Sequence, residues 1–125
     1  MLRKIILSVC CAAIGMAAAA KVRLPHIISD GMVIEQNTDV NFWGWASPGK
    51  AVKVTTSWTK DKQTVTADQS GRWSIKVHSP KAGFTPLSIT FNDGDRVTVN
   101  NILSGEVWLC GGQSNMEMPM EGWDN

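Results

Sequence analysis

Several stretches of this chain alternate between residues suited to a core and residues suited to water. The alternation has a period of two and runs through residues 52–58, 72–78, 87–92 and 96–99. The positions expected to face inward are Val52, Val54, Thr56, Trp58, Trp73, Ile75, Val77, Leu87, Ile89, Phe91, Val97 and Val99. Successive side chains of a β-strand point to opposite faces, so this pattern predicts half-buried strands.

Turn-forming residues separate these strands. They occur at residues 47–50, 68–71 and 92–95, where Pro, Gly, Asp, Asn and Ser cluster. About seven short strands at this spacing predict two packed antiparallel sheets, and no stretch before residue 114 has a convincing helical period. The expected class is therefore all-β, an antiparallel β-sandwich accessory domain spanning residues 21–103.

The pattern changes after residue 101. Two segments here are apolar without clean alternation, namely Ile102-Leu103 and Val107-Trp108-Leu109. A short, nearly continuous apolar run is typical of a strand buried on both faces of a parallel sheet. We therefore place a domain boundary at Ser104-Gly105 and expect residues 104–125 to begin an α/β domain.

Residues 1–20 have the pattern of a secretory signal peptide. A basic start, Arg3-Lys4, precedes an apolar run of about 12 residues and an Ala-rich end. A membrane anchor is the alternative, but the run is short for a bilayer of about 30 Å. We expect cleavage after Ala18 or Ala20, a secreted or periplasmic protein, and no membrane partner after cleavage.

Removal of the signal peptide changes the cysteine count and the net charge of the mature chain. Of the three cysteines only Cys110 remains, so the mature chain cannot form an internal disulfide. Loss of Arg3 and Lys4 from the 12 basic residues leaves 10 against 11 acidic ones, a net charge of about −1. No basic patch indicates a nucleic-acid partner.

Ser114 is the first candidate for chemistry. It follows Gly111-Gly112 at the end of the apolar run, and such glycines let a strand turn sharply and expose a serine hydroxyl. The alternative is a helix N-cap, because Ser114 and Glu117 form a capping box; the two interpretations are compatible. The segment is not the G-x-S-x-G elbow, since Met116 replaces its last glycine.

The longer run Gly105 to Met116, GEVWLCGGQSNM, resembles the first conserved block of the sialate O-acetylesterase family. Ser29–Gln36, Phe42–Gly49 and Asp68–Trp73 resemble three further family segments in the right order, although residues 34–36 depart from the usual Leu-Gln. The resemblance covers nearly all of residues 24–120. The family comprises secreted SGNH-type hydrolases that remove acetyl esters from sugars.

The resemblance implies roles for a few residues. Ser114 matches the nucleophile, its own N–H would donate to an oxyanion, and Gln113 and Asn115 would shape the substrate pocket. The family's other oxyanion donors and its catalytic His and Asp lie in later blocks, and no Asp-x-x-His occurs here. The resemblance thus implies a truncated hydrolase domain that has only its first strand and nucleophile turn, with no cofactor or metal.

Other residues receive more ordinary interpretations. His26 and His78 are expected to be solvated side chains, and neither has metal-ligand spacing to another ligand. Cys110 is expected to be a small buried hydrophobe. Among the six tryptophans, Trp43, Trp45 and Trp73 are expected in the core, whereas Trp123 is the candidate for lining a ligand pocket.

These observations favour the amino-terminal part of a secreted serine esterase that acts on an acetylated sugar and is inactive as this chain alone. The alternative is a non-catalytic secreted β-sandwich module that binds glycan or protein. The sequence leaves the particular sugar and the oligomeric state open.

Overall fold

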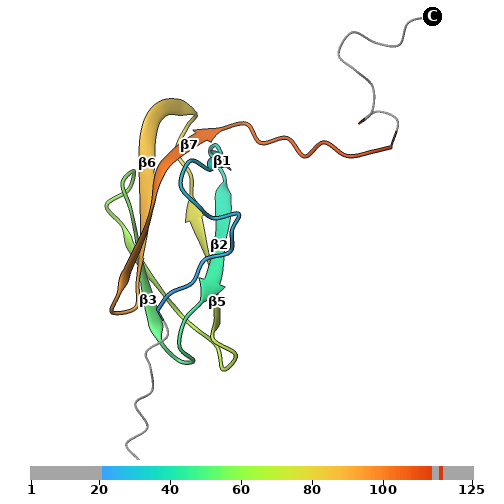
Figure 1. Cartoon of the computed structure of the whole chain (residues 1–125). Coiled ribbons are helices and arrows are strands. Elements are labelled where there is room, and N and C mark those ends of the chain that lie inside the picture. Colours follow the sequence, from blue (N-terminus) through green and yellow to red (C-terminus); the bar gives the residue numbers. More distant parts are fainter. Residues whose placement is uncertain (1–20, 114–115, 117–125) are drawn as a thin grey trace, which may run out of the picture.

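The computed structural model describes residues 21–113 and Met116. These residues contain seven strands: β1 (Val33–Glu35), β2 (Asp39–Trp45), β3 (Ala51–Thr56), β4 (Lys62–Thr66), β5 (Arg72–His78), β6 (Gly83–Asn92) and β7 (Arg96–Gly105). The all-β class is therefore confirmed (Figure 1). The described residues include no helix with the length and apolar character that crossing a bilayer requires.

The strands form two sheets. One has five strands in the order β1-β7-β6-β3-β4, and the other consists of β2 and β5. The expectation of purely antiparallel sheets was wrong for one pair, because β1 runs parallel to β7. A parallel pair needs a long connection. Here the connection comprises all of β2 to β6. Local alternation does not reveal the pairing of β1 with β7, because the two strands are so far apart in the sequence.

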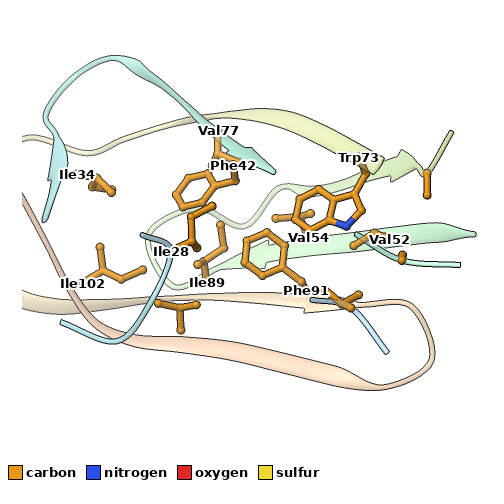
Figure 2. Close-up of a cluster of buried hydrophobic side chains, with 14 residues drawn as sticks. Ile28, Ile34, Phe42, Val52, Val54, Trp73, Val77, Ile89, Phe91 and Ile102 are labelled. Carbon is orange, nitrogen blue, oxygen red and sulfur yellow. The ribbon is translucent and has the colours of Figure 1, made fainter. Parts of the chain in front are cut away.

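The hydrophobic core lies between the two sheets (Figure 2). Phe42 of β2 and Phe91 of β6 are fully buried, with ring centroids 6.0 Å apart, and Trp73 of β5 lies 5.1 Å from Phe91. Burial of one such side chain is worth about 1.5–3 kcal/mol. These three rings connect the sheets. The predicted inward faces are confirmed for Val52, Val54, Trp73, Val77, Ile89, Phe91 and Val99, each less than 5% exposed.

A bulge explains the lost alternation near residue 102. Ile89 pairs with Val99, but Leu87 pairs with Ile102, so β7 carries one extra residue between these pairs. Asn101 has a φ of 56°, in the left-handed region. The bulge reverses the faces, and Ile102 and Ser104 are buried after it. The predicted boundary at Ser104-Gly105 falls on the last two residues of β7.

Residues 106–113 leave the sheets as an extended segment (Figure 1). Trp108 is 82% exposed and Leu109 fully exposed. Cys110 is also exposed, so its predicted burial was wrong. Likewise, residues 107–110 do not form the predicted strand. No described strand pairs with this segment, and burial on two faces requires neighbours on both sides.

Candidate functional site

Gln113 is the one predicted site residue that the structure describes. Its side chain is exposed, and its carbonyl oxygen accepts a hydrogen bond from the N–H of Met116 at 3.1 Å. A bond between residues three apart is typical of a tight turn. Ser114, Asn115 and Trp123 lie outside the described residues, so their predicted roles stay predictions.

The root of the segment that leads to Gln113 is firmly held. The last residues of β7 pair with β1, and the N–H of Gln36 donates to the carbonyl of Gly105 at 2.9 Å. The buried hydroxyl of Ser104 donates to the carbonyl of Pro80 at 2.7 Å. These bonds fix the position and direction in which the chain leaves the sheets.

Gln36 extends this anchor beyond the strand. Its Nε2 donates to the Glu106 carboxylate at 2.6 Å, and its Oε1 accepts from the N–H of Ala82 at 2.9 Å. One side chain thus ties together the end of β1, the start of β6 and the first residue of the segment 106–113, which we call the tail. Sequence reasoning placed Gln36 in a motif but missed this role, since its partners are 70 and 46 residues away.

The other motif residues are mainly structural. Asp30 accepts a hydrogen bond from the N–H of Asn100 at 2.7 Å, and Gly31 donates to the carbonyl of Asn100 at a φ of 80°. A Cβ on Gly44 would collide with the carbonyl of Arg23 and with the Trp73 ring. Asp30 and Gly31 thus tie the turn before β1 to β7, and Gly44 lets Arg23 and Trp73 approach β2 closely.

Asp68 organises the turn before β5. Its Oδ1 accepts hydrogen bonds from the Ser70 hydroxyl at 2.7 Å, the Ser70 N–H at 2.8 Å and the Arg72 N–H at 2.9 Å. The Ser70 hydroxyl bond, followed by the Arg72 N–H bond, lowers the pKa of Asp68 below its usual 3.8. The role is structural, because these partners lie in the turn and at the first residue of β5.

Both histidines are exposed, as predicted. What the sequence did not reveal is that Nδ1 of His78 lies 2.9 Å from Oδ1 of Asp39, its cross-strand neighbour. The two side chains are 69% and 61% exposed, which limits their mutual attraction through solvent screening. Within the described ranges, no three His, Cys, Asp or Glu residues cluster as metal ligands would.

The three tryptophans that were expected in the core differ in burial. Trp73 is buried at 3% exposure, as expected. Trp43 is half-buried and packs against the core cluster. Trp45 is half-buried as well, with the Arg23 guanidinium 5.4 Å from its ring centroid.

Two hollows lie on the surface of the sheets. The first, about 320 Å³, lies between the ends of β3, β4 and β5 and has Trp58, Asp61 and Gln63 in its lining. The second, about 370 Å³, is an apolar groove beside β1 and β2. Its lining includes Ile27, Val33 and Val107, which are 68%, 48% and 53% exposed. Large apolar side chains gathered at this exposure indicate a contact surface.

Comparisons with known proteins agree on one family. The sialate O-acetylesterase of Mus musculus is 28% identical over 117 residues, which cover 86% of this chain and 21% of that protein. The sialate O-acetylesterase of Homo sapiens is 29% identical over 106 residues, covering 77% of this chain and 20% of that protein. No protein-family model matches this chain.

A solved structure adds an independent comparison. A carbohydrate acetylesterase from Xanthomonas citri superposes with a TM-score of 0.69 at 36% identity, covering 79% of this chain and 22% of that chain. The resemblance to the sialate O-acetylesterase family is thereby confirmed over this stretch. The chain spans about a fifth of the length of the curated relatives it matches.

Proposed function

We propose that this chain is the amino-terminal part of a secreted carbohydrate O-acetylesterase that removes acetyl groups from sugars. Residues 1–20 serve as its signal peptide, residues 21–103 form a β-sandwich accessory domain, and residues 104–125 begin an SGNH hydrolase domain. The observation that carries the proposal is the likeness to the Xanthomonas citri carbohydrate acetylesterase, at 36% identity over 79% of this chain.

In the proposed reaction, the Ser114 hydroxyl attacks the acetyl carbonyl, the ester C–O bond breaks, and the sugar leaves with a free hydroxyl. Water then hydrolyses the acetyl-enzyme, which releases acetate and restores the Ser114 hydroxyl. A histidine base supplied by the rest of the proposed hydrolase domain takes the hydroxyl proton and passes it to the departing sugar oxygen, and an acid orients that base. The N–H of Ser114 stabilises the oxyanion. The substrate is an acetylated sugar, and no cofactor takes part.

The anchored exit of the tail supports this proposal. Glu106 is held by Gln36, and Val107 lines the apolar groove beside β1 and β2. Residues 107–110 would then enter the first strand of the hydrolase sheet. The hydrolase domain would cover the exposed Ile27 and Val33, because covering them removes apolar surface from water.

The test begins with the gene. A reading frame that continues past codon 125 and encodes an Asp-x-x-His near its end is expected. The encoded protein should release acetate from acetylated xylan and from acetylated sialic acid at different rates, and its Ser114→Ala variant should release none from either. Turnover that survives in Ser114→Ala would contradict the proposed nucleophile. A true stop codon, with no hydrolase sequence downstream, would favour the non-catalytic binding module.

A further inference from the structure

The hollow between the ends of β3, β4 and β5, which we call the inter-sheet pocket, has no role in the proposed reaction. Its floor is apolar, since Val54 and Val77 line it and are 2% and 3% exposed. Its rim is polar and includes Thr56, Asp61 and Gln63. An apolar floor with a few convergent polar groups is the usual composition of a small-molecule site.

Gln63 lies on the face of the sheet that carries the core. It pairs across the strands with Val54, and cross-strand partners share one face. Gln63 is nevertheless exposed, on the edge strand β4, opposite a sheet of only two strands. A polar side chain on an inward face breaks the apolar pattern that a core requires, which is typical of functional positions.

Trp58 gives the pocket an aromatic wall. Its indole N–H donates to the carbonyl of His78 at 2.9 Å, so the ring is held against the end of β5. The loop that follows is also ordered: the N–H of Thr59 donates to the Thr56 hydroxyl, and the N–H of Asp61 donates to the Thr59 hydroxyl. A ring and loop held in advance lose little entropy when a ligand binds.

The polar groups around this ring are available to a ligand. The Asp61 carboxylate and the Gln63 amide make no hydrogen bond to any other described residue. A carboxylate accepts from two adjacent hydroxyls, and an amide both donates and accepts. An indole face packs well against an apolar C–H surface. Together these groups match a sugar ring, which has C–H groups on its faces and hydroxyls around its edge.

The charge of the pocket selects among sugars. Asp61 lines it, and the carboxylate of Asp39 is bound to His78 at its border. No Lys or Arg is in its lining. An anionic sugar would meet like charge here, which is unfavourable even when water screens it. We therefore propose that the inter-sheet pocket binds a neutral hexose or pentose unit, such as one residue of a polysaccharide backbone.

One lining residue also contacts the strand that leads toward Ser114. Pro80 lines the pocket, and its carbonyl accepts the hydrogen bond from Ser104, the penultimate residue of β7. The inference rests on the proposed function in one respect, the choice of a glycan as ligand. A unit held here would belong to the same glycan that carries the acetyl group, and the pocket would strengthen binding of the polymeric substrate.

Calorimetric titration of residues 21–125 with unacetylated xylohexaose and cellohexaose tests the inference. At least one should bind with a Kd of about 0.1–1 mM, which corresponds to a binding free energy of about 4–5.5 kcal/mol. Trp58→Ala and Gln63→Ala should each weaken binding at least tenfold. The control Thr64→Ala, on the same strand but the opposite face, should bind normally. Amide NMR shifts caused by the sugar should centre on residues 56–63.

Several outcomes would overturn the inference. These are no binding of either oligosaccharide, binding unchanged in both folded pocket variants, or tighter binding of N-acetylneuraminic acid than of the neutral sugars. Because Trp58 packs partly against the core, Gln63→Ala and Asp61→Asn keep the test valid if Trp58→Ala does not fold. Binding needs no catalysis, so Ser114→Ala should bind normally. Failure of the esterase proposal would therefore leave this result intact.

Discussion

The side chain of Gln36 donates a hydrogen bond to the carboxylate of Glu106 at 2.6 Å and bridges 70 residues of sequence. The bond joins the end of β1 to the first residue after β7. It lies where the parallel pairing of the two strands ends, at Glu35 and Gly105. The first residue after β7 is thus held to the end of β1.

The first prediction concerns this anchor. Gln36→Ala should lower the free energy of unfolding by about 1–2 kcal/mol, because it removes bonds to Glu106 and to the N–H of Ala82. The same substitution should also accelerate hydrogen exchange of the Ala82 amide. Chemical denaturation and exchange measure both effects. The control is Gln69→Ala, in an exposed turn, and equal losses in the two variants would contradict the anchoring role.

The second prediction concerns pH. Since folding lowers the pKa of Asp68, this residue contributes stability that is present above its unfolded pKa of 3.8 and is lost as pH falls through the folded value. Asp68→Asn keeps an acceptor oxygen but lacks the charge. Its Tm should therefore be lower than that of the unmodified chain at pH 7, with the gap closing below about pH 4. A gap that stays constant down to pH 2 would show that the charge is irrelevant. Asp95→Asn, in the next hairpin, serves as the control.

The third prediction concerns Gly44. A Cβ at this position has no room between the carbonyl of Arg23 and the Trp73 ring, so Gly44→Ala should destabilise the fold by about 1–3 kcal/mol. Gly83→Ala is the matched control, because a Cβ there meets nothing within 4 Å. Thermal unfolding followed by Trp fluorescence compares the two, and similar melting temperatures would contradict the argument.

The fourth prediction concerns activity. Residues 21–125 should not hydrolyse p-nitrophenyl acetate above the background of their Ser114→Ala variant, because a serine without a general base is a weak nucleophile at neutral pH. Turnover above that background would reveal a base within this chain. The exposed His78, bound to Asp39, would then be the first residue to replace.

The fifth prediction concerns the exposed tail. Val107, Trp108 and Leu109 present apolar surface, and no described strand pairs with them. Such segments associate with each other. Sedimentation of residues 21–125 should show association that grows with concentration and is reduced by Leu109→Lys. Phe84→Lys is the control, since Phe84 is 96% exposed on β6. Strong, concentration-independent amide protection of residues 107–110 in a monomer would mean instead that the tail docks on the sheets.

Much of the fold was predictable because alternation is a local property. The inward positions of β3, β5 and β6 follow from a period of two, and the turn at Asp68 follows from side chains that bond nearby N–H groups. The strand β4 was harder to recognise. Its segment, Lys62–Thr66, is largely polar because it lies at the edge of its sheet, with little of it covered.

The candidate site was predictable only as a motif. Resemblance pointed to Gln113 and Ser114, but not to Gln36, which holds the root of their segment. The inter-sheet pocket was also missed, because Trp58 and Gln63 have separate local patterns that meet only when β3 and β4 pair. Cys110 was assigned to a core on the assumption of neighbouring strands, none of which is among the described residues.

The sequence by itself determined β3, β5, β6 and the first part of β7, with their inward faces and turns, because each depends on residues within a few positions of one another. Tertiary structure alone decided the parallel pairing of β1 with β7, the Asp39–His78 contact and the exposure of residues 107–110. These features join or separate residues that are distant in the chain. Their energies arise from packing and pairing between elements, which no local pattern encodes.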